Sequence, residues 1–170
     1  MPANLSKKKP KPTDGPAEVY AKLRNKVFNI NPKEVGILQT KETPNVWGIL
    51  MDTRYPEAAV TLMSLADGTT SLYFSNGGGM IGGGEHAAVA QSTKSFIATA
   101  EKYYKKMNLT ESFPLPAIDS VTFYVLTFSS VFTFEVNENK LGNGKHGLSP
   151  LFYSGQEVIA QLRTIQEQMK

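Results

Sequence analysis

Six of the chain's 14 glycines lie within eight residues, and this cluster is where the sequence most clearly suggests a site. The segment consists of Gly77, Gly78, Gly79, Met80, Ile81, Gly82, Gly83 and Gly84. Glycine adopts positive φ angles and allows another backbone or a ligand to approach closely, although ordering it costs conformational entropy. The cluster therefore predicts a special backbone path, a place where a ligand or partner approaches, or both.

The spacing Gly77-x-Gly79-x-x-Gly82 matches the dinucleotide-binding fingerprint. That fingerprint requires a parallel βαβ unit, whereas the strand before these glycines is expected to belong to an antiparallel hairpin. An acidic residue should bind the ribose about 20 residues further on, but that position falls among lysines and tyrosines of an expected helix. We therefore expect no nicotinamide or flavin cofactor.

A phosphate-binding P-loop is excluded because no Gly-Lys-Ser/Thr sequence follows the glycines. Free N–H groups at the start of the next helix could still bind an anion. However, Glu85 in that first turn would repel a phosphate, and the nearest basic residue downstream is Lys94. We rank a strand-to-helix hinge, partly capped by Glu85, above a phosphate site.

Glu85 and His86 could form an acid–base pair beside the glycines. The other histidine is His146, and two histidines without a third ligand do not predict a zinc site. The chain has no cysteine, which excludes disulfides, thiolate metal sites and cysteine nucleophiles. We predict no metal site and no catalytic residues beyond the candidates His86 and Glu85. No spacing predicts a catalytic pair among the carboxylates Asp52, Glu57, Glu85, Asp119, Glu135 and Glu138.

The composition, with 41% hydrophobic and 19% charged residues, is typical of a globular protein. The net charge of +3 comes from four lysines within residues 1–12, and without them 14 basic residues stand against 15 acidic ones. We predict a disordered basic tail over residues 1–14 and a single α+β domain over residues 15–170. The tail is expected to solubilise the protein, and nucleic-acid binding through it is ranked lowest.

The lysines near the N-terminus are not followed by an apolar run, so we expect no signal peptide. No apolar stretch approaches the roughly 18 residues that would span a bilayer. The absence of cysteine fits a reducing compartment. We therefore expect a cytoplasmic protein.

Periodicity and turn signals predict three helices and five strands. Asp67-Gly68 favours a tight hairpin, and Ser129-Ser130 is expected to form a second turn. The C-terminal helix is expected to start at the capping-box pattern Ser154-Gly155-Gln156-Glu157. The other elements are helices over 16–30 and 85–107 and strands over 46–54, 58–66, 69–75, 120–128 and 131–137.

Bulky apolar residues occur on both faces of these strands, so both faces of the sheet must be covered. We predict a single five-stranded antiparallel sheet with helices on both faces, in the order α-β-β-β-α-β-β-α. Helical spacing predicts an apolar side on the first helix, formed by Val19, Leu23, Val27 and Ile30. It predicts an apolar stripe on the helix over 85–107, formed by Val89, Phe96, Ile97, Ala100, Tyr104 and Met107. It predicts that the C-terminal helix buries Val158, Leu162, Ile165 and Met169.

Two stretches resemble a group of uncharacterised bacterial proteins: Val60 to Ser75 (VTLMSLADGTTSLYFS), and Leu148 to Phe152 (LSPLF) with Val158 to Arg163 (VIAQLR). The resemblance covers most of residues 46–165 and implies no mechanism. The order of elements is also similar to profilin-like and roadblock sandwiches, which are usually non-catalytic and act through dimers and partners. Roadblock domains place two strands before the middle helix and three after it, whereas here three precede it and two follow.

Our first hypothesis is a non-catalytic cytoplasmic binding or scaffolding domain, acting through protein–protein contacts near the glycine-rich loop 77–84. Met80 and Ile81 are either tucked into the core as an anchor or exposed for a partner, and the partner can be a second copy of the chain. The alternative is a small-molecule or anion-binding protein, with or without enzymatic activity, whose site lies at the loop 77–86.

Overall fold

The computed structural model describes residues 14–169, so the predicted tail over residues 1–14 lies almost entirely outside the described part. Among these residues, none of the helices is long and apolar enough to cross a membrane. The elements are α1 (Pro16–Phe28), β1 (Val46–Arg54), β2 (Ala59–Leu65), β3 (Thr70–Phe74), β4 (Gly79–Met80), the 3-10 helix η1 (Gly83–Glu85), α2 (Ala87–Tyr103), the 3-10 helix η2 (Tyr104–Lys106), β5 (Asn108–Thr110), β6 (Ser120–Thr127), β7 (Val131–Asn137), α3 (Glu138–Gly142) and α4 (Ser149–Gln168).

The strands of this region form one antiparallel sheet in the order β4-β3-β2-β1-β6-β7-β5. The α+β class and the antiparallel sheet are confirmed, but the prediction of five strands was wrong, because the described chain has seven. The two additional strands, β4 and β5, have two and three residues and lie at opposite edges of the sheet. Strands this short are too brief to show the alternation that identifies a strand in a sequence.

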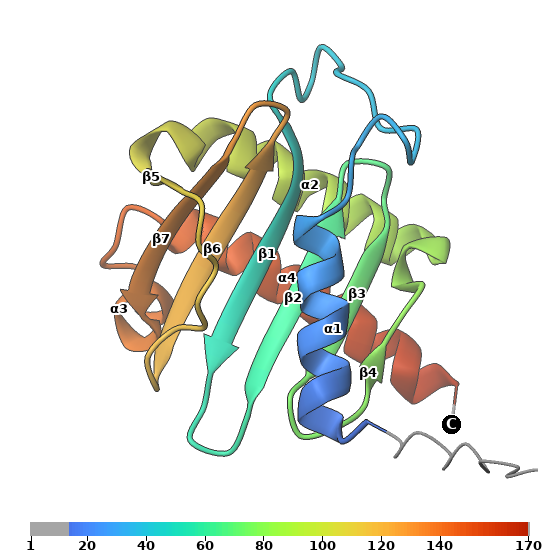
Figure 1. Cartoon of the computed structure of the whole chain (residues 1–170), viewed down its shortest axis with the longest axis vertical. Coiled ribbons are helices and arrows are strands. Elements are labelled where there is room, and N and C mark those ends of the chain that lie inside the picture. Colours follow the sequence, from blue (N-terminus) through green and yellow to red (C-terminus); the bar gives the residue numbers. More distant parts are fainter. Residues whose placement is uncertain (1–13, 170) are drawn as a thin grey trace, which may run out of the picture.

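Helices cover the sheet on both faces: α2 and α4 lie behind it and α1 lies in front of it (Figure 1). The central strand β1 explains this arrangement, because eight of its nine residues are buried. From Ile49 its side chains alternate between two cores, with Ile49 and Met51 in the core beneath α2 and α4 and Leu50 in the core beneath α1. Trp47 also lies in the core beneath α1, next to an irregularity in the pairing with β6 between Val46 and Gly48. An apolar sheet surface that faced water on either side would be costly, so a layer on each face is required.

The helix that follows the glycines is confirmed in its position and in the face that it buries. It begins at Ala87, and η1 and η2 extend the helical path on either side, so the expected range of 85–107 was slightly too long. The residues predicted to form its apolar stripe are buried, namely Val89, Phe96, Ile97, Ala100, Tyr104 and Met107.

The C-terminal helix starts earlier than predicted, so the capping-box assignment was wrong. α4 begins at Ser149 with Pro150 in its first turn, a position that proline favours, and Ser154 lies inside the helix. Gly155 serves packing instead, because a Cβ atom there would lie 2.7 Å from Met51 Sδ and 3.1 Å from Phe96 Cζ. The glycine therefore lets α4 cross close to β1 and α2.

Candidate functional site

The glycine segment 77–84 follows the edge of the sheet and is held there by close contacts between backbones. In β4, Gly79 pairs with Tyr73 and Met80 pairs with Leu72 of β3. Gly79 has a φ of 149°, and a Cβ atom on it would lie 2.2 Å from the Leu72 carbonyl oxygen. A side chain at this position would therefore force β4 away from β3.

Gly83 and Gly84 are packed just as closely, whereas nothing lies within 4 Å of a Cβ atom on Gly82. A Cβ atom on Gly84 would lie 1.9 Å from the carbonyl oxygen of Gly68, in the turn between β2 and β3. Gly83 is buried, and a Cβ atom there would lie 2.4 Å from Leu162 Cδ2 of α4. These glycines provide a special backbone path, which was one of the two alternatives that their clustering predicted.

Met80 and Ile81 take opposite positions. Met80 is half-buried and packs against the core beneath α2 and α4, whereas Ile81 is 71% exposed. Met80 is therefore the expected anchor in the core, and its neighbour Ile81 is the expected exposed residue. Ile81 follows directly after β4, which has a neighbouring strand on one side only.

The acid–base candidates Glu85 and His86 both have exposed side chains. His86 is the N-cap of α2 and its side chain forms no capping hydrogen bond, while Glu85 belongs to η1. The prediction that Glu85 partly caps this helix was therefore wrong. Within residues 14–169, no three His, Cys, Asp or Glu side chains are grouped so that they could hold a metal ion.

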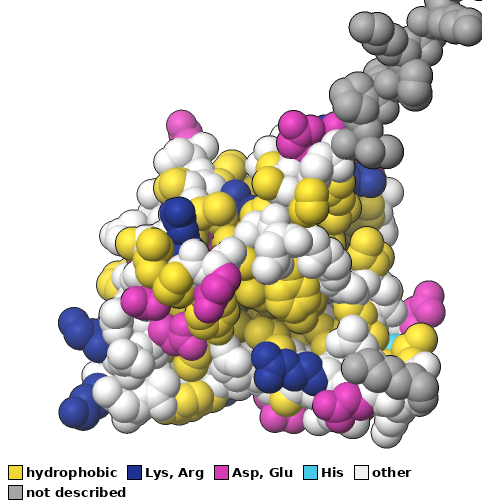
Figure 2. Space-filling model, turned by 90° about the horizontal axis from the view of Figure 1, so that it is seen from below, with side chains coloured by type: hydrophobic (Ala, Val, Ile, Leu, Met, Phe, Trp, Pro, Cys, Tyr) yellow, Lys and Arg dark blue, Asp and Glu magenta, His cyan; other side chains and the backbone are white. Residues whose placement is uncertain are grey.

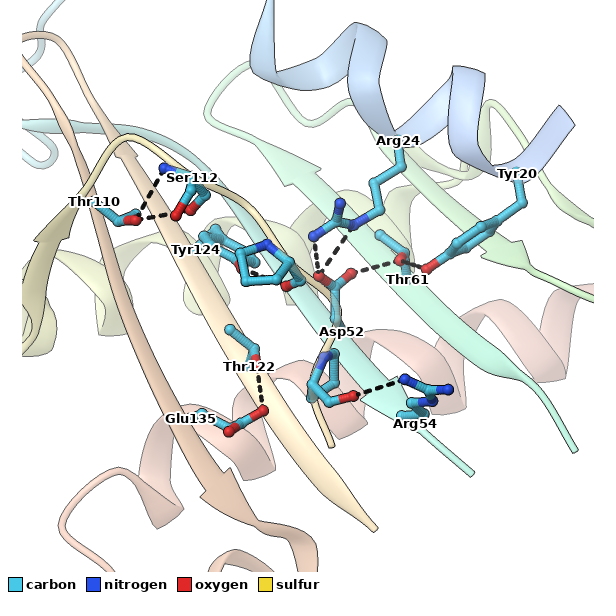
Figure 3. Close-up of polar contacts among 12 residues, drawn as sticks. Tyr20, Arg24, Asp52, Arg54, Thr61, Thr110, Ser112, Thr122, Tyr124 and Glu135 are labelled. Atoms are coloured by element: carbon cyan, nitrogen blue, oxygen red, sulfur yellow. Dashed lines mark hydrogen bonds and ion pairs between the residues drawn. The ribbon is translucent and has the colours of Figure 1, made fainter. Parts of the chain in front are cut away.

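A buried ion pair that the sequence patterns did not predict joins α1 to the sheet (Figure 3). Arg24 of α1 donates to Asp52 Oδ2 of β1 from Nε at 3.1 Å and from Nη2 at 2.8 Å. Asp52 is fully buried and Arg24 is 6% exposed. Removing either charge alone would leave the other charge buried without a partner.

A chain of hydroxyl groups completes the coordination of the Asp52 carboxylate. Thr61 of β2 donates to Asp52 Oδ1 at 2.5 Å, so its oxygen is free to accept the hydrogen bond from the Tyr20 hydroxyl at 2.6 Å. Burial raises the pKa of Asp52, while the hydrogen bonds from Arg24 and Thr61 oppose this shift. Three donors surround the carboxylate, which favours its ionised form.

Aromatic rings close the ion pair off from solvent. The Arg24 guanidinium lies 5.2 Å from the centroid of the Phe28 ring and 5.5 Å from that of Tyr124, within the range of cation–π attraction. Phe113 stacks on Phe28 with the ring centroids 4.0 Å apart, and the Tyr124 hydroxyl donates to the carbonyl oxygen of Pro114. The ion pair and its aromatic neighbours therefore hold both α1 and the segment before β6 against the sheet. We assign them a structural role.

The ion pair also explains why the buried face of α1 differs from the prediction. Val19 is 44% exposed, while Tyr20 and Arg24 are buried. The sequence carried a signal that could have indicated this pairing. Arg24 lies four residues after Tyr20 and three before Val27, and Asp52 lies two residues after the apolar Leu50, on the same face of its strand. Two opposite charges that each fall on an apolar face predict a buried pair.

No family model, curated protein or solved structure matches this chain, so the geometry described above is what supports a proposal of function.

The buried ion pair predicts strongly non-additive substitutions. Asp52→Leu should lower the free energy of unfolding by about 3–5 kcal/mol, because Arg24 is left buried without its counter-ion. The double variant Arg24→Met/Asp52→Leu should lose much less than the sum of the two single variants. Urea denaturation of the four proteins tests this, and additive losses would contradict the pairing.

The tyrosines of this cluster predict a loss of stability in alkali. Burial, and next the charge of Asp52, raise the pKa of Tyr20 and of Tyr124 to about 12, above the ordinary value of 10.0. Between these values the unfolded chain loses protons that the folded protein keeps, so the free energy of unfolding should fall as the pH rises through this window. Denaturation curves of the Tyr20→Phe/Tyr124→Phe variant should show a shallower fall, and an unchanged slope would refute the assignment.

The close backbone contacts predict that two glycines without a positive φ, Gly84 and Gly147, differ in their tolerance of alanine. Gly84→Ala should lower the free energy of unfolding by about 1–3 kcal/mol, since its Cβ meets backbone that cannot rotate away. Gly147→Ala is the matched control, because nothing lies within 4 Å of a Cβ atom there. Its effect should stay within about 0.5 kcal/mol. Equal effects in thermal denaturation would show that the segment is not tightly packed.

Proposed function

We propose that this chain is a non-catalytic cytoplasmic binding or scaffolding domain, which contacts its protein partner through Ile81 and the outer edge of β4. The observation that carries the proposal is the 71% exposure of Ile81, which lies between two glycines in close contact with the rest of the fold, Gly79 and Gly83. A large apolar side chain on a fixed backbone loses little conformational freedom when a partner covers it.

The edge of β4 supports the same function. Its N–H and C=O groups on the side away from β3 have no neighbouring strand in the described sheet. An open strand edge can pair with an extended segment of another chain, with the main chain supplying affinity and a side chain such as Ile81 supplying specificity.

The partner in this proposal is a second copy of the chain. Two β4 strands that pair edge to edge about a twofold axis would present the same surface from each copy, as in most homodimers. The resemblance of the element order to profilin-like and roadblock sandwiches, many of which act as dimers, belongs to the same proposal. This resemblance is supported by the position of α2, which lies between two sets of antiparallel strands in the sequence.

The alternative, a small-molecule or anion site at the loop 77–86, depends on Glu85 and His86. Both side chains are exposed, and the hollow of about 260 Å³ that this loop lines involves Gly77 and Gly78 rather than Glu85 or His86. The geometry therefore favours contact with a protein partner over catalysis by these two residues.

The proposal predicts that wild-type protein dimerises and that Ile81→Ser weakens the dimer at least tenfold. The reason is that an isoleucine side chain buried in an interface contributes about 1.5–3 kcal/mol. Sedimentation velocity over a concentration series measures the dissociation constant. At concentrations low enough for both proteins to be monomeric, the melting temperature should not change, because Ile81 is 71% exposed and lies outside the core.

Leu109→Ser is the matched control, because Leu109 is 68% exposed on β5 at the opposite edge of the sheet. This variant should dimerise like the wild type. A wild-type protein that remains monomeric at its highest soluble concentration would refute self-association, as would equal effects of the two substitutions.

A further inference from the structure

A hollow of about 390 Å³ lies at the end of the sheet where β1 turns into β2, between the sheet and α4. Its apolar residues are Val60, Leu72 and Phe74 from the sheet and Ile159 from α4. Figure 2 looks at this end of the molecule and shows apolar side chains gathered near its middle, with acidic and basic side chains around them. The volume lies in the range of small-molecule sites.

The polar groups of this hollow are divided between two sides. On α4, Gln156 and Arg163 lie on the same face as Ile159, at spacings of three and four residues. On the other side, the turn between β1 and β2 contributes Tyr55 and Glu57. The hollow therefore has a basic side on the helix and an acidic side on the turn.

The two charges face the same hollow without neutralising each other. Among residues 14–169, neither Arg163 nor Glu57 forms an ion pair with the other or with any other residue. The negative side is reinforced by Glu138, whose charge acts on Tyr55. Burial and then the charge of Glu138 raise the pKa of Tyr55, so its hydroxyl stays protonated and can donate a hydrogen bond.

We infer that this hollow binds a small zwitterion with an apolar side group, of the chemical class of a hydrophobic α-amino acid. Its carboxylate would pair with Arg163, whose planar guanidinium matches a carboxylate, and its ammonium group would lie towards Glu57. Its apolar group would lie on Leu72, Phe74 and Ile159.

Charge complementarity selects the zwitterion over simpler ligands. A fatty acid would satisfy Arg163 but place its chain beside Glu57 without a counter-charge, and an amine would leave Arg163 unpaired. This site and the β4 edge use different residues, so either can exist without the other.

The test is a titration of the ¹⁵N-labelled full chain, followed by NMR, with three probes that share one phenyl group. They are L-phenylalanine (zwitterion), 3-phenylpropionate (anion) and phenethylamine (cation). We expect L-phenylalanine to bind at least tenfold more tightly than either other probe, because each of them lacks one charge-assisted contact. The shifted amides should lie in residues 53–60, 72–76 and 156–163.

Arg163→Gln should weaken the binding of L-phenylalanine about tenfold and leave that of phenethylamine unchanged. Glu57→Gln should weaken L-phenylalanine and leave 3-phenylpropionate unchanged. Lys102→Gln, an exposed charge on α2, is the control and should change nothing. All three sites are exposed, and equal melting temperatures will show that the variants fold. Equal binding of the three probes, no binding, or shifts in other segments would overturn the inference.

Discussion

The structure depends on covering both faces of a sheet whose central strands are apolar on each side. β1 and β6 are buried almost along their whole length, so neither face can be left to water. Two long helices, α2 and α4, cover one face, where Gly155 allows them to approach closely. The other face is covered by one helix, α1, together with Ile37 of the connection after it and the segment before β6, so its cover is thinner.

The thinner layer, α1, is held against the sheet by an ion pair as well as by apolar contacts. Arg24 and Asp52 meet in the interior, where the Coulomb attraction between them is strong and where an unpaired charge would be costly. The pair therefore fixes the rotation of α1 as well as its position. This explains why Tyr20 faces the sheet while Val19, which the apolar pattern favoured, faces solvent.

Most of the sheet could be predicted from the sequence because long strands and α2 carry a clear periodicity. β1 and β7 have the predicted bounds, and the apolar stripe of α2 is buried as expected. The predictions that were wrong, namely the number of strands and the start of α4, have physical causes. β4 and β5 are too short for alternation. The start of α4 was placed too late because Ser154 and Glu157 match a capping box, although both lie inside the helix.

The unusual backbone path of the glycine segment was predictable, but the contacts that it makes were not. The density of glycines indicated a special path at 77–84, yet no local pattern could show which backbones meet Gly79 and Gly84, because those contacts come from β3 and the turn before it. Likewise, nothing along the chain brings Arg163 and Glu57 to one hollow, since they are far apart in sequence. Tertiary packing decides both.

The central claim is that the segment 77–84 is an ordered edge that a second copy of the chain covers. Hydrogen–deuterium exchange of peptides from this segment, measured at low and at high protein concentration, tests it most directly. The account predicts slow exchange in dilute protein, because the backbone is packed, and further slowing as the concentration rises. Fast exchange at both concentrations would contradict the ordered edge, and slow exchange that does not depend on concentration would contradict the contact between copies.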